Sequence, residues 1–318
     1  MILTISLNPG LDITYSFTHF NLNNINRVSH NKILKVAGGK TLNVTRVIKQ
    51  SGTNVLSTGI VGGLVGEEII QLLNAHGVRN DFYRIAGDSR NNITIATEGK
   101  STEILEQGPC ISENESKEFL KHLKTVLENN KNIRLVVMSG SLPPGLSSNY
   151  YTEILKIAKS FDVLSIVDTS GGALKEVINC KYKPYCIKPN ETELKELFSI
   201  ENGDLLSVDV CLNLLSSETL NGIEWIIYTQ GSEGAIIKHG KRFYKANIPQ
   251  KLEIINPTGS GDSTIAGFCV GLLTKQDDAH IIKHAMAYGI LNAMEDKTGY
   301  INIDNLSNIE QQIEIINL

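Results

Sequence analysis

Over the last two thirds of the chain, short apolar runs alternate with segments of helical periodicity, and this pattern restricts the fold more than any other feature. A charged helix predicted over 113–129 leads to an apolar strand over 134–138. A second helix, over 148–160, leads to a strand over 163–167 that ends at Asp168. Strands that alternate with helices predict the α/β class, with a mostly parallel sheet covered by helices on both faces.

Polar residues or glycines follow several of these apolar runs, where each predicted strand ends. The positions that share this feature are Gly38, Ser139, Lys188, Thr229 and Gly259. In a parallel α/β sheet, ligands bind beyond the carboxyl ends of the strands. We therefore expect these positions to gather at one edge of the sheet.

The segment 252–273 is the strongest candidate for chemistry. It is predicted to contain a strand over 252–255, a turn at Gly259-Ser260-Gly261, and a helix rich in small and apolar residues. A glycine turn at a helix start directs backbone N–H groups and the positive end of the helix dipole at one point, which suits an anion. Asp262 adds a carboxylate there. It is either a general base that takes a proton from an attacking hydroxyl or an acid that merely stabilises the first helical turn.

A second glycine turn, at Gly38-Gly39, precedes a predicted helix that has Lys40 and Asn43 in its first turns. Although Gly39-Lys40-Thr41 suggests a P-loop, that motif requires a glycine at the position that Leu34 occupies, so we reject it. The turn could bind a hydroxylated or phosphorylated ligand at the helix N-terminus. It could equally be an ordinary strand–helix connection.

The chain is predicted to leave the main sheet twice, over about 12–36 and about 88–108. Both segments are β-prone, and the second contains a hairpin around 98–100. We expect them to pair in a small sheet that covers the crevice of the main one. Arg27 lies in the first segment, where a solvated surface charge is the simplest interpretation, and Arg90 lies at the entrance of the hairpin.

Two residue pairs have the spacing of metal ligands. Asn190 and Glu193 at a helix start form a capping-box pattern, and a role toward Mg²⁺ through water becomes plausible only beside bound phosphates. His280 and His284 are four residues apart on a predicted helix. Because no third ligand is evident for zinc, we expect them to be helix-surface residues.

Composition excludes several classes of function. The chain has 318 residues and a formal net charge of -4, which argues against broad binding to nucleic acid or membranes. Its 5 cysteines show no CxxC spacing, so a reduced, cytoplasmic protein is expected. The segment from Met1 to Leu7 is too short for a signal peptide and is predicted to be the first strand.

Five motifs occur in one order along the chain. They are Gly38-Gly39-Lys40-x-x-Asn43, Ser139-Gly140-Ser141-Leu142-Pro143, Lys188-Pro189-Asn190-x-x-Glu193, Thr229-x-Gly231-x-x-Gly234 and Gly259-Ser260-Gly261-Asp262. Together they resemble the PfkB branch of the ribokinase-like sugar kinases, from residue 2 to about 303. The resemblance implies one domain over 1–318, a three-layer sandwich with a mostly parallel central sheet, and a small β-sheet lid formed by about 12–36 and 88–108.

Further segments are similar to the phosphosugar kinases of this branch. Those closest to the tagatose-6-phosphate kinases are 103–109 and 256–264, whereas 1-phosphofructokinases remain an alternative. Thr41 departs from the pattern, where a glycine is usual, and its side chain would either narrow the sugar site or change the turn. A regulator that binds sugar phosphate without catalysis is a remote alternative, because Asp262 and its glycine turn are intact. A nicotinamide dehydrogenase is not supported, since Asn8-Pro9-Gly10 is not its glycine fingerprint.

The resemblance also implies a role for each matching residue. The catalytic residues would be Asp262 as general base and Gly259, Ser260 and Gly261 around the transferring phosphoryl group. The residues that bind the phosphosugar would be Asp12, Arg27, Gly38, Gly39, Lys40, Asn43, Arg90 and Ser139. Those that bind ATP would be Lys188, Asn190, Thr229, Gly231, Gly234, Thr258 and Asn292. Glu193, with Asn190, would hold Mg²⁺ through water. A homodimer through the lid is expected, with Arg27 acting across it.

Overall fold

The computed structural model describes residues 1–201, 206–249, 252–274 and 277–318, and these form two β-sheets. In the described residues the larger sheet has ten strands in the order β14-β13-β12-β11-β10-β9-β8-β1-β4-β5. Its strands are β1 (Ile2–Ser6), β4 (Val55–Gly62), β5 (Arg79–Ile85), β8 (Leu135–Ser139), β9 (Leu164–Asp168), β10 (Cys186–Ile187), β11 (Trp225–Thr229), β12 (Ala235–His239), β13 (Arg242–Asn247) and β14 (Glu314–Asn317).

The strands from β5 to β11 pair in parallel, which confirms the prediction from the alternating pattern. Strand β1 lies between β8 and β4, with Ile2 opposite Val55 of β4 and opposite Leu135 of β8. Beyond β11 the pairing becomes antiparallel through β12, β13 and β14. The strand–helix alternation does not extend to this edge, because a short turn joins β12 to β13.

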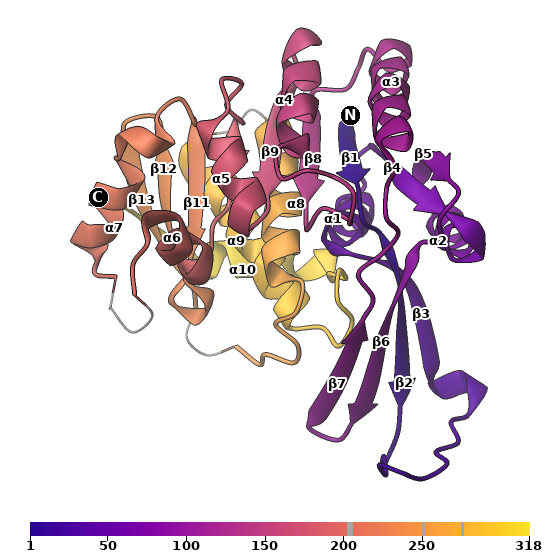
Figure 1. Cartoon of the computed structure of the whole chain (residues 1–318). Coiled ribbons are helices and arrows are strands. Elements are labelled where there is room, and N and C mark those ends of the chain that lie inside the picture. The colour runs from indigo at the N-terminus through magenta and orange to yellow at the C-terminus, as the bar shows by residue number, and fades with distance from the viewer. Residues whose placement is uncertain (202–205, 250–251, 275–276) are drawn as a thin grey trace.

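Helices cover both faces of the larger sheet, so that three layers result (Figure 1). On one face lie α3 (Glu113–Asn129), α4 (Tyr150–Ser160), α5 (Gly171–Asn179), α6 (Glu191–Phe198) and α7 (Val208–Leu215). On the other lie α1 (Lys40–Gln50), α8 (Ser260–Leu273), α9 (Asp278–Ala293) and α10 (Leu306–Gln312). No helix in the described ranges is long and apolar enough to cross a membrane.

The central strands are buried on both faces. In β8, Val136 and Met138 pack against the α3–α7 layer, whereas Leu135 and Val137 pack against the layer that contains α8 and α9. Strands of this kind read as continuous apolar runs in the sequence, because side chains alternate between two dry faces. Each fully buried side chain of this size contributes about 1.5–3 kcal/mol to stability.

The smaller sheet has the order β3-β2-β6-β7 and projects from the body of the molecule (Figure 1). Its strands are β2 (Gly10–Ser16), β3 (Ile33–Gly38), β6 (Arg90–Thr97) and β7 (Lys100–Leu105). Strand β2 pairs with β6, with Ile13 opposite Ile93, so the predicted pairing of the two β-prone segments is confirmed. Helix α2 (Gly63–Ala75) anchors this sheet by packing Ile69 and Leu73 against its base.

The predicted strand over 252–255 is wrong. This segment has no regular structure, and the backbone N–H groups of Ile255 and Asn256 both donate to the carbonyl of Ala293 at the end of α9 (2.8 and 3.0 Å). The alternation of polar and apolar residues there has another cause, since Leu252 and Ile254 line a cavity. By contrast, the helix predicted over 113–129 is confirmed, and the capping box formed by Ser112 and Glu115 fixes its start.

Candidate active site

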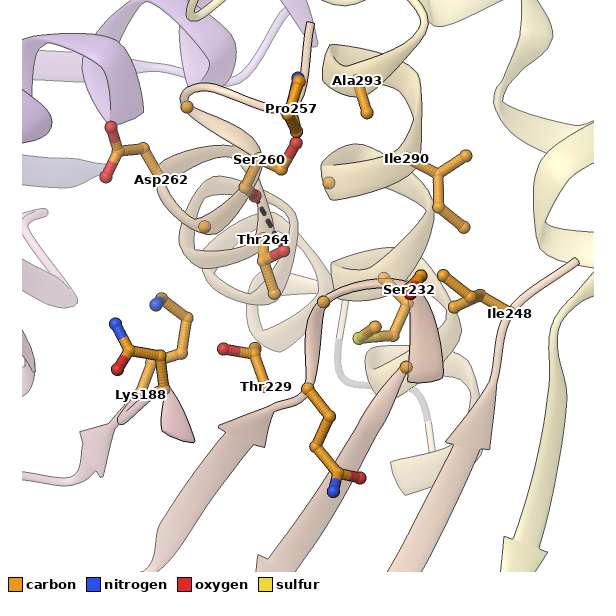
Figure 2. Close-up of a pocket in the computed structure, with 18 of the residues that line it drawn as sticks. Lys188, Thr229, Ser232, Ile248, Pro257, Ser260, Asp262, Thr264, Ile290 and Ala293 are labelled. Carbon is orange, nitrogen blue, oxygen red and sulfur yellow. Dashed lines mark hydrogen bonds between the residues drawn. The ribbon is translucent and has the colours of Figure 1, made fainter. Parts of the chain in front are cut away.

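The carboxyl ends of the parallel strands open into a cavity of about 890 Å³. Lys188 and Thr229, which follow β10 and end β11, line it together with Gly259 at the start of α8. Asp262 and Lys188 lie on one side of this cavity, while Ile248 and Ile290 lie on the other (Figure 2). The predicted convergence of strand ends is therefore confirmed for Lys188 and Thr229, and Gly259 lies beside them although the described residues before it, 252–258, form no strand.

The start of α8 has the conformation that its glycines predict. Gly259 has φ +85°, in the left-handed region, and an added Cβ would lie 2.7 Å from the Thr298 methyl group. The N–H of Ser260 donates to the Pro257 carbonyl (3.2 Å). The next N–H groups, of Gly261 and Asp262, belong to the first turn, where a helix offers them no internal partner. This end of α8 can therefore hold an anion.

Asp262 is a buried carboxylate at that point, with 5% of its surface exposed. The pKa of its carboxyl is raised to about 6, mainly by burial and also by the nearby Asp168, while a hydrogen bond from Asn43 and the charges of Lys40 and Lys188 partly offset this. The Asn43 Nδ2 group donates to Asp262 Oδ2 at 2.8 Å. A carboxylate with a pKa near 6 is ionised at neutral pH yet can accept a proton, as a general base requires.

Asp168 is a site residue that the sequence analysis does not identify. It lies at the end of β9, its carboxylate is 3.3 Å from Lys188 Nζ, and Ser139 Oγ donates to it at 3.1 Å. It also raises the pKa of Lys40. Its Oδ1 atom is buried without a hydrogen-bond partner. Asp168 could have been identified from the sequence, because it is an acidic residue at the end of a predicted parallel strand, where ligands bind in such sheets.

Asn190 and Glu193 form the predicted capping box of α6. Asn190 Oδ1 accepts from the Glu193 N–H, and Glu193 Oε2 accepts from the Asn190 N–H, both at 2.9 Å. Asn190 lines the cavity, whereas Glu193 lies behind it, and burial raises the pKa of the Glu193 carboxyl. Together with Asp168, these residues supply the oxygen donors that Mg²⁺ prefers.

The half of the cavity opposite Asp262 is apolar, which the sequence motifs do not predict. Its walls are Ile248, Leu252, Ile254, Met286 and Ile290. A flat aromatic group could bind between such walls. Among the predicted nucleotide residues, those that line the cavity are Lys188, Asn190, Thr229, Gly231, Gly234 and Thr258.

Asn292 does not line the cavity. It is fully buried, its Nδ2 group donates to the Thr258 carbonyl (2.8 Å), and its Oδ1 accepts from Ser263 Oγ and from the Gly299 N–H (3.1 and 2.8 Å). All of its hydrogen bonds are thus made within the protein. The family resemblance predicts that Asn292 lies near the nucleotide, but in the structure it instead holds the turn that precedes α8.

Two of the predicted sugar ligands, Lys40 and Asn43, line this cavity, and Asp12 and the Gly38-Gly39 turn lie next to them in the fold. Asp12 accepts a hydrogen bond from Asn92 Nδ2 at 2.7 Å, and burial raises the pKa of its carboxyl. A side chain at Gly38 would come within 2.0 Å of the Asp12 carboxylate, which explains the glycine there. Gly39, with φ +96°, allows α1 to begin at Lys40, and Lys40 and Asn43 line the cavity.

The two predicted phosphate-binding arginines are separate from Asp262. Arg90 lines a second cavity, of about 480 Å³, and donates to the carbonyls of Asn8 and Glu106 (both 3.2 Å). The loop that connects β2 to β3 lies at the far end of the small sheet (Figure 1), and Arg27 belongs to this loop and is exposed. In the described part of the chain it lines neither cavity.

Comparison with known proteins identifies the family. The chain matches the pfkB family of carbohydrate kinases over residues 11–304. It is 46% identical to a tagatose-6-phosphate kinase of Staphylococcus epidermidis over 317 residues, which is 99% of both chains. The fold matches phosphofructokinase-2 of Escherichia coli in complex with potassium (TM-score 0.85, 22% identity, 98% of each chain) and in complex with fructose-6-phosphate (TM-score 0.83, 22% identity, 98% of each chain).

This chain belongs to the pfkB family of carbohydrate kinases. It is therefore a sugar phosphotransferase with ATP as a substrate, and its ribokinase-like fold agrees with the architecture expected from the sequence.

In this kinase the side chain of Thr41 contacts the ends of two strands. It is buried, and Oγ1 faces the sheet, where it lies 2.6 Å from the Ser139 carbonyl and 3.2 Å from the Ile5 carbonyl and accepts from the Ser139 N–H at 3.1 Å. Of the two effects expected for Thr41, the buried position of its side chain argues against a narrowed sugar site. The residue instead fastens α1 to the ends of β1 and β8.

The expectation for the histidines of α9 is only partly correct. His280 is half-buried, but His284 is buried, and its Nδ1 atom is 2.7 Å from Glu310 of α10. Nitrogen and oxygen atoms of all three residues lie within 4.8 Å of one another, so Glu310 is the third potential ligand that the sequence does not reveal. The contact between His284 and Glu310 fastens α10 to α9.

Proposed function

We propose that this kinase transfers the γ-phosphoryl group of ATP to D-tagatose 6-phosphate and forms D-tagatose 1,6-bisphosphate. The observation that carries the choice of substrate is the 46% identity, over 99% of both chains, with a protein named tagatose-6-phosphate kinase. The cavity geometry supports the transfer itself, because a buried carboxylate, two lysines and a helix N-terminus face one space.

Asp262 acts as the general base in this proposal. The sugar hydroxyl loses its proton to the Asp262 carboxylate as its oxygen bonds to the γ-phosphorus, and the bond from that phosphorus to the ADP oxygen breaks. Lys188 and the first-turn N–H groups of α8 offset the negative charge that spreads over the phosphoryl oxygens. Asn43 orients the carboxylate through the 2.8 Å hydrogen bond. Correct placement of the two substrates can itself supply about 7–11 kcal/mol of the barrier reduction.

Mg²⁺ fits the oxygen donors beside Lys188. The Asp168 Oδ1 atom accepts no hydrogen bond, although Lys188 Nζ lies 3.3 Å from it, and Asn190 and Glu193 follow at the start of α6. Mg²⁺ usually keeps several waters and takes one or two carboxylates, so contacts through water suit these positions. When bound, the ion would neutralise charge on the ATP phosphates.

We further propose that the small sheet is a lid of the single domain 1–318 and that two copies of the chain pair through it. On one face of this sheet, Asp12 of β2 lies opposite Asn92 of β6, which in turn lies opposite Leu105 of β7. Leu34 of β3 lies on the same face, because it is two residues from Val36, the residue opposite Asp12. Both leucines are exposed, at 60% and 41%. A partner subunit that packs there would cover them and could receive Arg27 from the loop at the end of the lid.

The test is ADP release with Mg-ATP and a panel of acceptors. The panel contains tagatose 6-phosphate, fructose 1-phosphate, fructose 6-phosphate and the unphosphorylated sugars, and the readout is the ratio of their kcat/KM values. We expect tagatose 6-phosphate to be preferred. Preference for fructose 1-phosphate would overturn the choice of substrate and leave the mechanism intact.

Asp262→Asn is the matched variant for the mechanism. We expect kcat to fall at least ~100-fold, because a general base typically contributes that much or more. ATP binding should persist, since the amide is of the same size. Turnover near that of the wild type would rule out Asp262 as the base.

A further inference from the structure

Arg46 is an arginine buried inside α1, behind the catalytic cavity. Only 7% of its surface is exposed, and burial lowers the pKa of its guanidinium to about 10, so it remains a cation at neutral pH. Buried arginines are rare unless their donors are used. Nothing in the mechanism above requires Arg46, and it is not among the residues expected to touch a substrate.

The guanidinium joins three segments of the site. It donates to the Ala37 carbonyl before the Gly38-Gly39 turn, to the Thr298 carbonyl (2.9 Å), and to the Oδ1 atom of Asn43 (2.8 Å). Asn43 in turn donates from Nδ2 to Asp262 at 2.8 Å. A continuous path of hydrogen bonds thus connects Arg46 to the general base.

This path fixes the orientation of the Asn43 amide. A guanidinium has only donors, so the Asn43 oxygen must face Arg46. The Asn43 NH₂ group must then face Asp262, where it donates to the carboxylate. If the amide turned over, two oxygens would face each other and the carboxylate would lose its hydrogen bond. The positive charge of Arg46 also interacts with both Asp12 and Asp262.

We propose that Arg46 is a positioning residue for phosphoryl transfer, which orients the Asn43 amide and through it holds the Asp262 carboxylate ready to accept the sugar proton. This inference rests on the proposed function, because it assigns a task relative to the base. It differs from a purely structural role, since a structural residue would support the fold without altering the protonation of Asp262.

The first test compares Arg46→Met with Gln50→Ala. Gln50 is a matched control because its side chain also ties α1 to the segment near Thr298, donating to the Gly299 carbonyl (3.0 Å) and accepting from the Ile301 N–H (2.9 Å), yet it does not touch Asn43. Asp262 must be ionised to act, so kcat/KM falls as the pH drops below its pKa, which is about 6. This fall is the acidic limb of the pH profile. We expect Arg46→Met to shift the acidic limb to higher pH by about one unit, because loss of a nearby positive charge raises the pKa of a carboxyl group.

The acidic limb should stay in place in Gln50→Ala, although its thermal stability falls. Arg46→Lys keeps the charge but cannot reproduce the forked contacts, so we expect a smaller shift of the limb and a roughly 10-fold lower kcat. This variant decides the matter if Arg46→Met does not fold. The proposal would be overturned if Arg46→Met or Arg46→Lys lowered stability but left both kcat and the acidic limb of the kcat/KM pH profile as in the wild type.

A second readout does not depend on catalysis. The Asp262 carboxyl carbon can be titrated by ¹³C NMR in the wild type, Arg46→Met, Arg46→Lys and Gln50→Ala proteins, with Asp262→Asn identifying its signal. We expect the pKa of Asp262 to rise in Arg46→Met and to remain at the wild-type value in Gln50→Ala. If the wild type turns over no acceptor, the proposed function fails, yet this titration still decides the role of Arg46. An unchanged Asp262 titration in Arg46→Met would refute it.

Discussion

At the scale of single residues, two glycines of the catalytic turn have different reasons to be glycine. Gly259 has a left-handed backbone and faces Thr298, whereas Gly261 has ordinary helical geometry and an added Cβ would lie 3.2 Å from Lys188 Nζ. Gly259 is therefore required by its backbone conformation, whereas Gly261 leaves room for the flexible side chain of Lys188. Substitution by alanine separates these two requirements.

We predict that Gly259→Ala lowers stability by about 1–2 kcal/mol, the cost of a left-handed residue with a side chain, and also impairs activity. Gly261→Ala should keep or raise the melting temperature, because alanine is the better helix former, while kcat falls as Lys188 is displaced. Thermal unfolding and kcat of both variants provide the measurement. Equal losses of stability in the two variants would contradict this distinction.

At the scale of elements, α1 is held against the sheet by polar contacts as well as by its apolar face. Thr41 bonds to Ser139 of β8, and Thr45 Oγ1 lies 2.7 Å from Thr4 Oγ1 of β1. These contacts set the place of α1, which presents Lys40 and Asn43 to the cavity. The orientation of the proposed catalytic side chains thus depends on the docking of a whole helix.

We predict that Thr41→Val destabilises the protein by about 1–3 kcal/mol, because it leaves buried backbone groups of Ser139 without their partner. Thr125→Val, on the exposed face of α3, is the control and should change stability by less than ~0.5 kcal/mol. Urea unfolding measures both. Since Thr41 faces the sheet, KM for the sugar should change little, and a large rise in KM would show that Thr41 reaches the sugar after all.

At the scale of the whole molecule, the proposed pairing of two lids determines whether the site is complete. Arg27 lies in the loop at the end of the small sheet, and exposed apolar side chains lie on the same sheet. If Arg27 completes the phosphosugar site of a partner, affinity for the sugar phosphate must depend on assembly. Affinity for ATP should not depend on assembly, because the apolar half of the cavity comes from α9 and from Ile248, Leu252 and Ile254 of the same chain.

We predict a solution mass of twice 34.9 kDa for the wild type, measured by light scattering after gel filtration. The Leu34→Glu/Leu105→Glu variant should be monomeric, with a higher KM for the sugar phosphate and an unchanged KM for ATP. Leu164→Glu, at an exposed leucine of β9 in the main sheet, is the matched control and should remain a dimer. A wild type that is monomeric at micromolar concentration would refute the pairing.

The sequence by itself determined the parallel α/β architecture, because strands buried on two faces must be apolar throughout and amphipathic helices must cover them. It also determined the glycine turn at the start of α8, since glycines that tolerate a left-handed backbone and a helix start that can hold an anion are local properties. The local sequence pattern gave a wrong prediction over 252–255, where the apolar residues line a cavity and do not form a strand.

Only the tertiary structure decided which distant residues meet. Asp168, the buried position of Asn292, the inward-facing Thr41 and the path from Arg46 through Asn43 to Asp262 all depend on contacts between segments far apart in the chain. The physical reason is that a hydrogen bond or a shifted pKa depends on distance and burial in three dimensions, whereas sequence periodicity reports only which face of an element is dry.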